Sequence, residues 1–230
     1  MNARRSSPAG WEMKRPRSQT GFSLVELLIV TIVMTTMVGI ASMLLQPILQ
    51  QARVTNAYNT TLMAMRIARE TAIAQRGAYV VTFTAGAGPN SISVAPAPQW
   101  ANAPADGAYT ATYTLPSDVV FTVNAGVPTS NVAPNCTPDC FGTAGRAVDF
   151  DQNVNGAIPN QIYFCPDGSA QDIATGVLCS SNLNNGVVYI ARAGDLYSSR
   201  AITLWGSTGR LRGWRLLASG TCGTNCWSQQ

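Results

Sequence analysis

The sequence predicts an α+β fold in which one long N-terminal α-helix, transmembrane in its first half, packs against antiparallel β-sheets with disulfide-stapled loops. Two patterns predict the helix. Residues without a single charge run from Leu27 to Ala52, and apolar residues at helical spacing continue to about Arg76. A third pattern predicts the sheets, because the remaining chain consists of short segments that alternate like half-buried strands.

Residues 1–21 form a basic leader. They hold five cations against Glu12, and the whole chain has a formal net charge of +4, so the part from residue 22 onward is formally neutral. A positive leader is retained on the cytoplasmic side of a membrane. The overall charge therefore gives no reason to infer a nucleic-acid partner.

Residues 22–49 are long enough to cross a bilayer, since about twenty apolar residues suffice. The exception among them is Glu26, because a charge at the centre of a membrane helix costs about 2.5–3.5 kcal/mol on insertion scales. Cleavage after Gly21 supplies a partner, since it exposes the α-amino group of Phe22 one helical turn from Glu26, or within reach of a neighbouring copy. Hydroxyls that can bond back to the helix accompany the apolar residues: Thr31, Thr35, Thr36 and Ser42. Gly39 and Pro47 mark places where the helix can bend.

Residues 50–76 continue the helix outside the membrane with one apolar stripe. The stripe consists of Val54, Tyr58, Leu62, Met65, Ala68 and Ala72. Arg76 and Gly77 read as the helix end, with the glycine supplying the left-handed cap. We expect residues 77–230 to form an exported β domain laid against this stripe.

The β domain is predicted from segments rich in β-branched and aromatic residues. Glycine-rich and asparagine-rich turn signals separate them, and residues 85–108 and 126–145 read as long loops, the first interrupted by one strand. The predicted strands are 79–83, 91–94, 109–115, 119–123, 146–150, 161–164, 186–192, 200–205 and 210–217.

The six cysteines favour disulfides, because an even set in an exported domain is typical of a disulfide framework. Proximity favours pairing Cys136 with Cys140 and Cys222 with Cys226, which leaves Cys165 to join Cys179. This is one of fifteen connectivities. Zinc binding is the alternative, and the absence of histidine and the oxidising compartment argue against it.

The residues around Gly21 resemble a known signal. Lys14 to Gly21, followed by Phe22 to Val30, is similar to the class III leader of type IV pilins and type II secretion pseudopilins. The resemblance implies cleavage between Gly21 and Phe22 by prepilin peptidase, N-methylation of Phe22, and Glu26 as the carboxylate that guides the subunit into a filament. An ordinary signal peptide is the alternative, but its cleavage site follows the apolar stretch.

The same resemblance implies partners and a location. The partners are other pilins or pseudopilins, met through the N-terminal helix, and an inner-membrane assembly platform. The location is the bacterial inner membrane, crossed once with the leader cytoplasmic and the C-terminal domain periplasmic, and afterwards a pilus or pseudopilus filament.

Four downstream blocks resemble the minor subunits called FimT in pili and GspH in secretion systems. The blocks are 66–77, 186–190, 200–204 and 209–212. The resemblance implies a scarce subunit near the filament tip. Some FimT-like pilins that serve natural transformation bind DNA through a C-terminal Gly-Arg-x-Arg element, which Gly209, Arg210, Leu211 and Arg212 match.

A DNA contact has a physical basis in the predicted last strand. Alternation places Arg210, Arg212 and Trp214 on one face about 7 Å apart. Arg215 points to the other face unless the strand twists or ends, but it and Arg200 can still enlarge a positive patch. The alternative is that these arginines form surface ion pairs, for example with Asp195, and that Trp214 belongs to the core.

The sequence lacks the residues that catalysis or metal binding would need. Without histidine there is no obvious general base, and oxidised cysteines are not nucleophiles, so the sequence predicts neither an enzyme nor a cofactor. Residues 151–156 begin like a calcium loop, but Ile162 stands at the twelfth position, where a bidentate glutamate is needed. The turn interpretation is therefore preferred.

Overall fold

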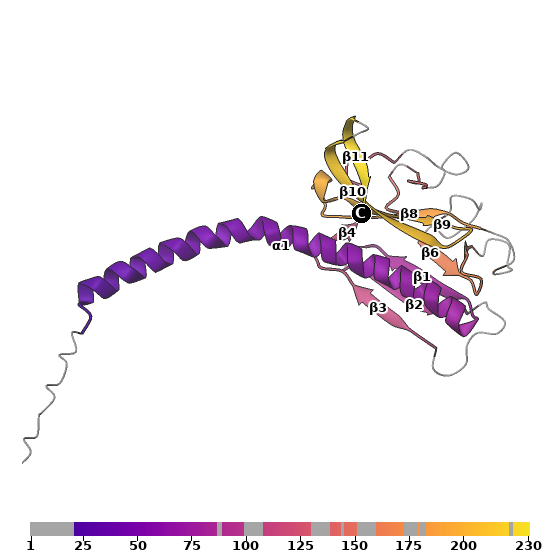
Figure 1. The fold of residues 1–230 in the computed structure, drawn as a ribbon, viewed down its shortest axis with the longest axis horizontal. Helices are drawn as coiled ribbons and strands as arrows, with labels where there is room; N and C mark the ends of the chain where they lie inside the picture. The colour runs from indigo at the N-terminus through magenta and orange to yellow at the C-terminus, as the bar shows by residue number, and fades with distance from the viewer. Residues whose placement is uncertain are drawn as a thin grey trace, which may run out of the picture. The chain divides into compact units, whose positions relative to one another are not determined.

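One helix, α1, runs from Leu24 to Gln75 in a computed structural model of the chain (Figure 1). The structure describes residues 21–86, 89–98, 108–129, 139–143, 145–150, 160–172, 179, 183–220 and 223–230. The chain divides into two compact units at the boundary between Gln46 and Pro47, which lies inside α1. Proline has no N–H to donate and so leaves one backbone carbonyl of the preceding turn unpaired.

The unit from Pro47 to Gln230 contains two antiparallel sheets. The first has the strand order β3-β2-β1-β6-β7 and the second β11-β10-β9-β8-β4, with β5 also paired to β8. Together with α1 they give the α+β class that the sequence predicts. The strands of the first sheet are β1 (Tyr79–Thr84), β2 (Ser91–Pro96), β3 (Ala111–Thr114), β6 (Gln161–Phe164) and β7 (Ala170–Gln171). Those of the second are β4 (Val120–Phe121), β5 (Val148–Asp149), β8 (Gly186–Ala191), β9 (Arg200–Trp205), β10 (Arg210–Gly220) and β11 (Gly223–Gln229).

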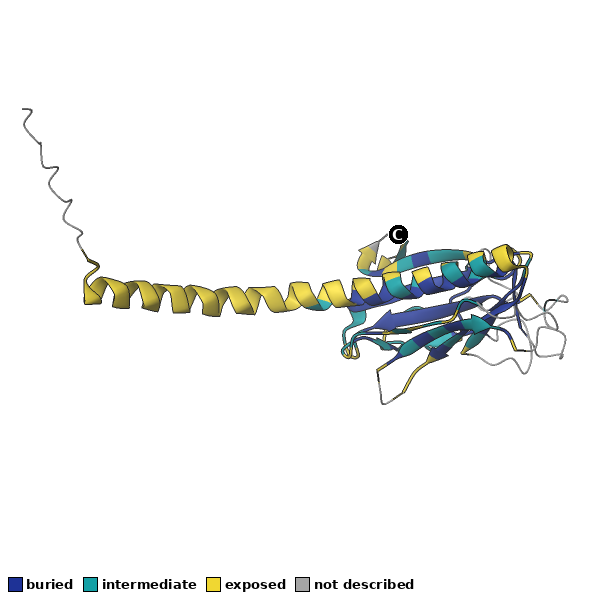
Figure 2. Cartoon of the chain, turned by 90° about the horizontal axis from the view of Figure 1, so that it is seen from below, coloured by how far each residue is buried: buried dark blue, intermediate teal, exposed yellow. Residues whose placement is uncertain are grey.

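One large apolar cluster joins α1 to both sheets. From the helix it takes one stripe, which Figure 2 shows in blue along the part of α1 that covers the strands. Met65 and Ala68 of that stripe are fully buried, together with Val81 of β1 and Ile202 of β9. The buried helix residues are Val54, Ala57, Tyr58, Thr61, Ala64, Met65, Ala68 and Ala72, and the predicted Leu62 packs at the edge of the same cluster.

The helix ends as predicted but with a different residue in the left-handed conformation. Arg76 has a φ of 49°, the Gly77 N–H donates to the carbonyl of Ala72 at 3.2 Å, and the Arg76 N–H donates to that of Ile73 at 3.4 Å. This is the Schellman pattern with Arg76, not Gly77, at its left-handed position. The prediction that Gly77 supplies this conformation is therefore wrong.

Three elements were not predicted from the sequence. β7 and the 3₁₀ turn η1 (Leu196–Ser198) are only two and three residues long, and such short segments contain too few alternating residues to give a periodic signal. β11 is seven residues long, but its sequence does not alternate between apolar and polar residues. β11 is ordered by its antiparallel register with β10, in which Leu216 lies opposite Trp227.

Candidate functional site

The predicted cleavage site lies just before α1. Gly21 and Phe22 are outside the helix, and the Ser23 carbonyl accepts the first helical hydrogen bond from the Leu27 N–H at 3.1 Å. Phe22 is 79% exposed, and a Cβ added at Gly21 meets nothing within 4 Å. The peptide bond between Gly21 and Phe22 is therefore in an open, non-helical segment, and glycine is not required there for packing.

Glu26 lies in the first turn of α1 and is exposed. A carboxylate at this position interacts favourably with the helix dipole, but within residues 21–230 as described it has no cation within 4 Å. The pairing of Glu26 with the α-amino group of Phe22 is not tested by this chain and stays a prediction.

Apart from Glu26 and Gln46, the first half of α1 exposes apolar side chains and hydroxyls that bond to their own helix. The Thr31 Oγ1 donates to the Leu28 carbonyl at 2.9 Å, and the Thr36 Oγ1 to the Val33 carbonyl at 2.8 Å. Thr35 and Ser42 do the same. The prediction that these hydroxyls satisfy themselves within the helix is confirmed.

α1 is the one helix in the described residues that is long and apolar enough to cross a membrane. Its best window has a mean hydropathy of 2.3 and no buried residue. In the first unit every large apolar side chain from Phe22 onward is exposed, including Ile29 at 55% and Met43 at 78% (Figure 2). A continuous apolar surface of this kind needs lipid or another protein to cover it.

The predicted C-terminal arginines lie in three different environments. Positions 211 and 213 face α1, since Leu211 packs on the core and a Cβ added at Gly213 would meet the Tyr58 hydroxyl. Arg215 follows in the same alternation and lines a cavity against Gln50 and Val54 of the helix. Arg212 and Trp214 therefore point to the opposite face of the sheet.

On that opposite face Arg212 is held by an acid. Its Nη1 lies 2.6 Å from the Asp139 Oδ2, and the other carboxylate oxygen accepts the Thr203 hydroxyl at 2.7 Å. The Thr203 Oγ1 in turn accepts the Trp214 Nε1–H at 2.9 Å, and Trp214 packs edge-on against Phe141. Arg212 is thus an ion-paired arginine, with Asp139 and not Asp195 as its partner.

Arg210 is exposed beside two further arginines of α1. It lines a cavity of about 510 Å³ together with Arg66, Arg69, Glu70 and Trp205. The Arg69 Nε–H donates to the Gly168 carbonyl at 3.1 Å. Three cations against one acid give this hollow a positive charge that the sequence did not predict, because residues 66–70 and 205–211 are far apart in the chain.

Arg200 and Arg215 lie directly opposite each other across β9 and β10. Arg200 is only 6% exposed, whereas Arg215 is exposed. Burial, and next the charge of Arg215, lower the pKa of Arg200 from its usual value. Desolvation by burial raises the pKa of the neighbouring Tyr58, so this tyrosine is neutral beside the guanidinium.

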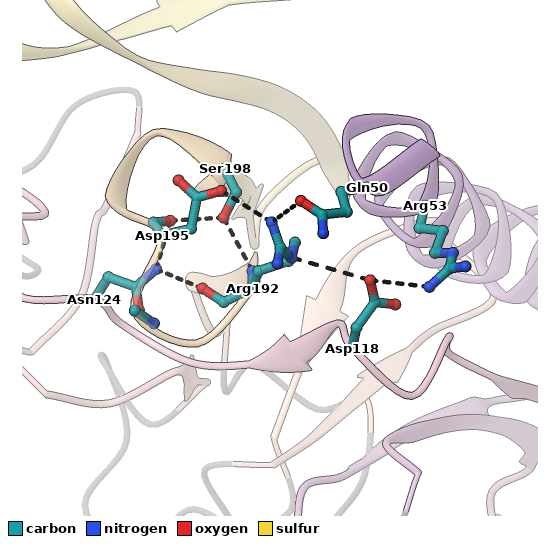
Figure 3. A network of polar contacts seen from close by, with 8 residues as sticks. Gln50, Arg53, Asp118, Asn124, Arg192, Asp195 and Ser198 are labelled. Carbon is teal, nitrogen blue, oxygen red and sulfur yellow. Dashed lines mark hydrogen bonds and ion pairs between the residues drawn. The ribbon is translucent and has the colours of Figure 1, made fainter. Parts of the chain in front are cut away.

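A polar network fixes the start of the buried part of α1 to the loop after β8 (Figure 3). The Asp118 Oδ2 lies 3.3 Å from the Arg53 Nη1 and 4.0 Å from the Arg192 Nε. The Arg192 Nη1 also donates to the Gln50 Oε1 at 2.8 Å and lies 3.5 Å from the Asp195 carboxylate. Sequence reasoning missed this network, since nothing in the pattern around Asp118 indicates its partners.

The cysteine predictions are met where the structure describes them. Cys165 and Cys179 form a disulfide, as predicted, and Cys140 and Cys226 are also disulfide-bonded. Cys136 and Cys222, and with them the two predicted local pairings, lie outside the described residues. The candidate calcium loop at 151–156 lies outside them too, and among the described residues there is no group of three acidic, cysteine or histidine side chains suited to a metal.

Comparison with known proteins identifies the N-terminal segment. Residues 16–42 match the prokaryotic N-terminal methylation motif, which is typical of the type IV pilin and pseudopilin superfamily. Comparison with curated proteins gave no match, and neither did comparison with solved structures.

The motif and the exposed apolar helix define the class of this protein. It is prepilin-like and consistent with a pilin or pseudopilin subunit, a structural and not a catalytic class. The motif implies processing by prepilin peptidase, assembly with other pilins, and a place in the inner membrane before assembly.

Proposed function

We propose that this chain is a minor pilin or pseudopilin, similar to FimT and GspH, that is incorporated into or primes a type IV pilus or a type II secretion pseudopilus. The observation that carries the proposal is the methylation motif at 16–42 leading into a helix half whose apolar side chains are all exposed. Such a surface is stable in lipid before assembly and against like helices afterwards.

Processing begins the proposed sequence of events. Prepilin peptidase cleaves between Gly21 and Phe22 and the new α-amino group of Phe22 is methylated. The leader, residues 1–21, stays cytoplasmic, residues 22–49 cross the inner membrane, and the domain from residue 77 onward is periplasmic. Residues 50–76 attach that domain to the membrane helix through the buried stripe.

Assembly then uses Glu26 and the apolar helix. A lone carboxylate in lipid is costly, so a neighbouring subunit whose α-amino group meets Glu26 lowers the free energy of the filament relative to the membrane. Near-neutral net charge of the processed chain fits a subunit held by helix packing instead of by charge.

Mass spectrometry of the chain co-expressed with prepilin peptidase tests this function. We expect a product that begins at Phe22 and carries one methyl group, and we expect Gly21→Ala to impair cleavage. Since a Cβ at Gly21 meets nothing, any loss reflects peptidase recognition and not misfolding; Gly39→Ala, equally unhindered, is the matched control. A product that starts at Met1, or one trimmed after the apolar segment, would contradict the proposal.

A second candidate function is DNA capture through the Gly209–Arg212 element. Arg210 supports it, because this exposed arginine shares a hollow with Arg66 and Arg69, and clustered arginines suit phosphate contacts. Arg212 supports it less, since Asp139 neutralises its charge. On this hypothesis Arg210→Ala weakens retention of duplex DNA at low salt, whereas the control Arg76→Ala does not. Equal retention of DNA by the parent chain, Arg210→Ala and Arg76→Ala would remove this candidate.

A further inference from the structure

Among the described residues, the facing arginines Arg200 and Arg215 have no acidic partner. They stand directly opposite each other across β9 and β10, on the face of the sheet that covers α1. Like charges in this arrangement are destabilising. In the described chain no carboxylate lies within 4 Å of either guanidinium.

Arg200 is the more unusual of the two, because it is 94% buried by residue surface and poorly satisfied. The only hydrogen bond of its guanidinium in the described chain runs from Nη1 to the Ser199 carbonyl at 3.4 Å, and its buried Nε has no acceptor. Buried charges in proteins are normally paired, since an unpaired one loses its hydration without compensation. The Tyr58 hydroxyl beside it is neutral and does not supply the missing charge.

A cavity of about 210 Å³ opens at these two arginines. Its wall contains Gln50 and Val54 of α1 together with Arg192, Asp195, Arg200 and Arg215. Asp195 is engaged by Arg192 at 3.5 Å, so the wall keeps an excess of two positive charges. Arg192 belongs to the network of Figure 3, which holds this side of the cavity in place.

We propose that this cavity is a receptor site for one carboxylate group supplied from outside the chain. Carboxylate is the chemistry that satisfies arginine elsewhere in the described chain, where Asp118, Asp139 and Asp195 pair with Arg53, Arg212 and Arg192. A planar carboxylate matches the fork of a guanidinium with two parallel hydrogen bonds. The group comes either from the acidic side chain of a neighbouring protein chain or from a free small acid.

Thermal unfolding of the full chain in detergent tests the site. We use acetate as the free acid and N-acetylaspartate amide as the side-chain analogue, each against chloride at equal ionic strength. A ligand that binds only the folded state raises Tm with its concentration, and we expect a rise of about 2–4 °C. A larger rise with the amide assigns the site to a neighbouring chain, and a larger rise with acetate assigns it to a free acid.

Three variants make the test specific. Arg215→Gln, at an exposed position, should lose the carboxylate-dependent rise, while Arg76→Gln, an exposed arginine away from the cavity, should keep it. Arg215→Glu places a carboxylate opposite Arg200, so its Tm in chloride should exceed that of Arg215→Gln and should not respond to added acid. Equal rises in the parent chain and Arg215→Gln, no rise in the parent chain, or a lower Tm for Arg215→Glu than for Arg215→Gln would overturn the proposal.

Discussion

Replacement of Gly213 by alanine tests how α1 is fastened to the second sheet. A Cβ at this position would lie 1.5 Å from the Tyr58 hydroxyl oxygen and 2.7 Å from its Cζ, whereas ordinary contact begins at 3.4 Å. Tyr58 is a buried residue of α1, only 5% exposed, so its ring is enclosed by neighbouring groups. The methyl group can be accommodated only if the helix and the strand separate or the ring leaves its rotamer.

The magnitude follows from two opposing effects. Exchanging glycine for alanine inside a strand ordinarily stabilises by about 0.5–1 kcal/mol through the unfolded chain. Overpacking a filled core costs about 1–3 kcal/mol, and a clash with the rigid end of a tyrosine belongs at the upper end of that range. The clash therefore wins, and a net loss of about 2 kcal/mol lowers Tm by about 4–8 °C for a domain of this size.

The assay is thermal unfolding of the full chain in detergent, followed by near-ultraviolet circular dichroism. Gly86→Ala is the control, since a Cβ there meets nothing within 4 Å. Tyr58→Leu shortens the opposing side chain, so in the double variant the alanine should cost at least about 1 kcal/mol less than in the parent chain. An unchanged Tm in Gly213→Ala, or a cost that Tyr58→Leu does not reduce, would refute the reasoning.

Three further predictions concern the outer face of the second sheet, the disulfide and alkaline stability. Arg212→Ala leaves the Asp139 carboxylate without its ion pair and should destabilise the domain by about 1–3 kcal/mol, measured as a lower Tm. Replacing Cys165 and Cys179 together by alanine opens a loop with a sequence separation of 14 and should cost about 3 kcal/mol, measured in the same way. Tyr189 is buried, and desolvation raises its pKa above 10.0, so above pH 10 this tyrosine is still protonated in the folded state but ionised in the unfolded state. Its contribution to the free energy of unfolding is therefore complete below pH 10. Above pH 10 that contribution falls by about 1.4 kcal/mol per pH unit.

Each of these predictions has its own check. Arg210→Ala, an exposed arginine outside the ion pair, should leave Tm unchanged, and an equal drop in both variants would contradict the role given to Arg212. Reduction of the parent chain should reproduce the loss of the double cysteine variant or exceed it. Tyr189→Phe removes the ionisable group, so the decline in Tm between pH 10 and 11 should become shallower; an identical slope would assign the alkaline transition to other groups, such as Tyr58 and Tyr163, whose pKa values burial also raises.

The helix could be predicted closely because its signals are local. A long uncharged apolar run and a stripe at helical spacing determine where α1 lies, and the structure moves its predicted start by only two residues, to Leu24. The cap could not be assigned from the sequence, since Arg76 and Gly77 are adjacent and either can follow the last turn. In the structure Arg76 takes the left-handed conformation and Gly77 is buried.

The strands could be predicted where their alternation is long and missed where it is short. β6 and β9 were predicted with the boundaries that the structure has, because their apolar and β-branched residues are flanked by turns. β7 is too short to carry a periodic signal and exists through its register with β6, in which Phe164 lies opposite Ala170. Pairing of this kind depends on the partner strand and is invisible to a single segment.

The candidate arginines could be found from the sequence, but their environments could not. The sequence placed Arg210, Arg212, Arg200 and Arg215 near the C-terminus and suggested one positive patch. Cross-strand register and distant partners then separated them, since Asp139 pairs with Arg212 while Arg200 is buried on the face of β9 that covers the helix. Ion pairs of this kind join residues many positions apart, so no local pattern indicates them.

The sequence by itself determined the class of this protein, because the signals are local in the chain: the basic leader, Gly21, Glu26 and the apolar run. Whether a segment enters a membrane depends on the hydropathy and charge of consecutive residues. Only the tertiary structure decided which arginines have a carboxylate partner and which do not among the described residues. Coulomb energy and desolvation depend on distance in space, and the fold alone brings Arg200 opposite Arg215 with no acid beside them in the described part of the chain.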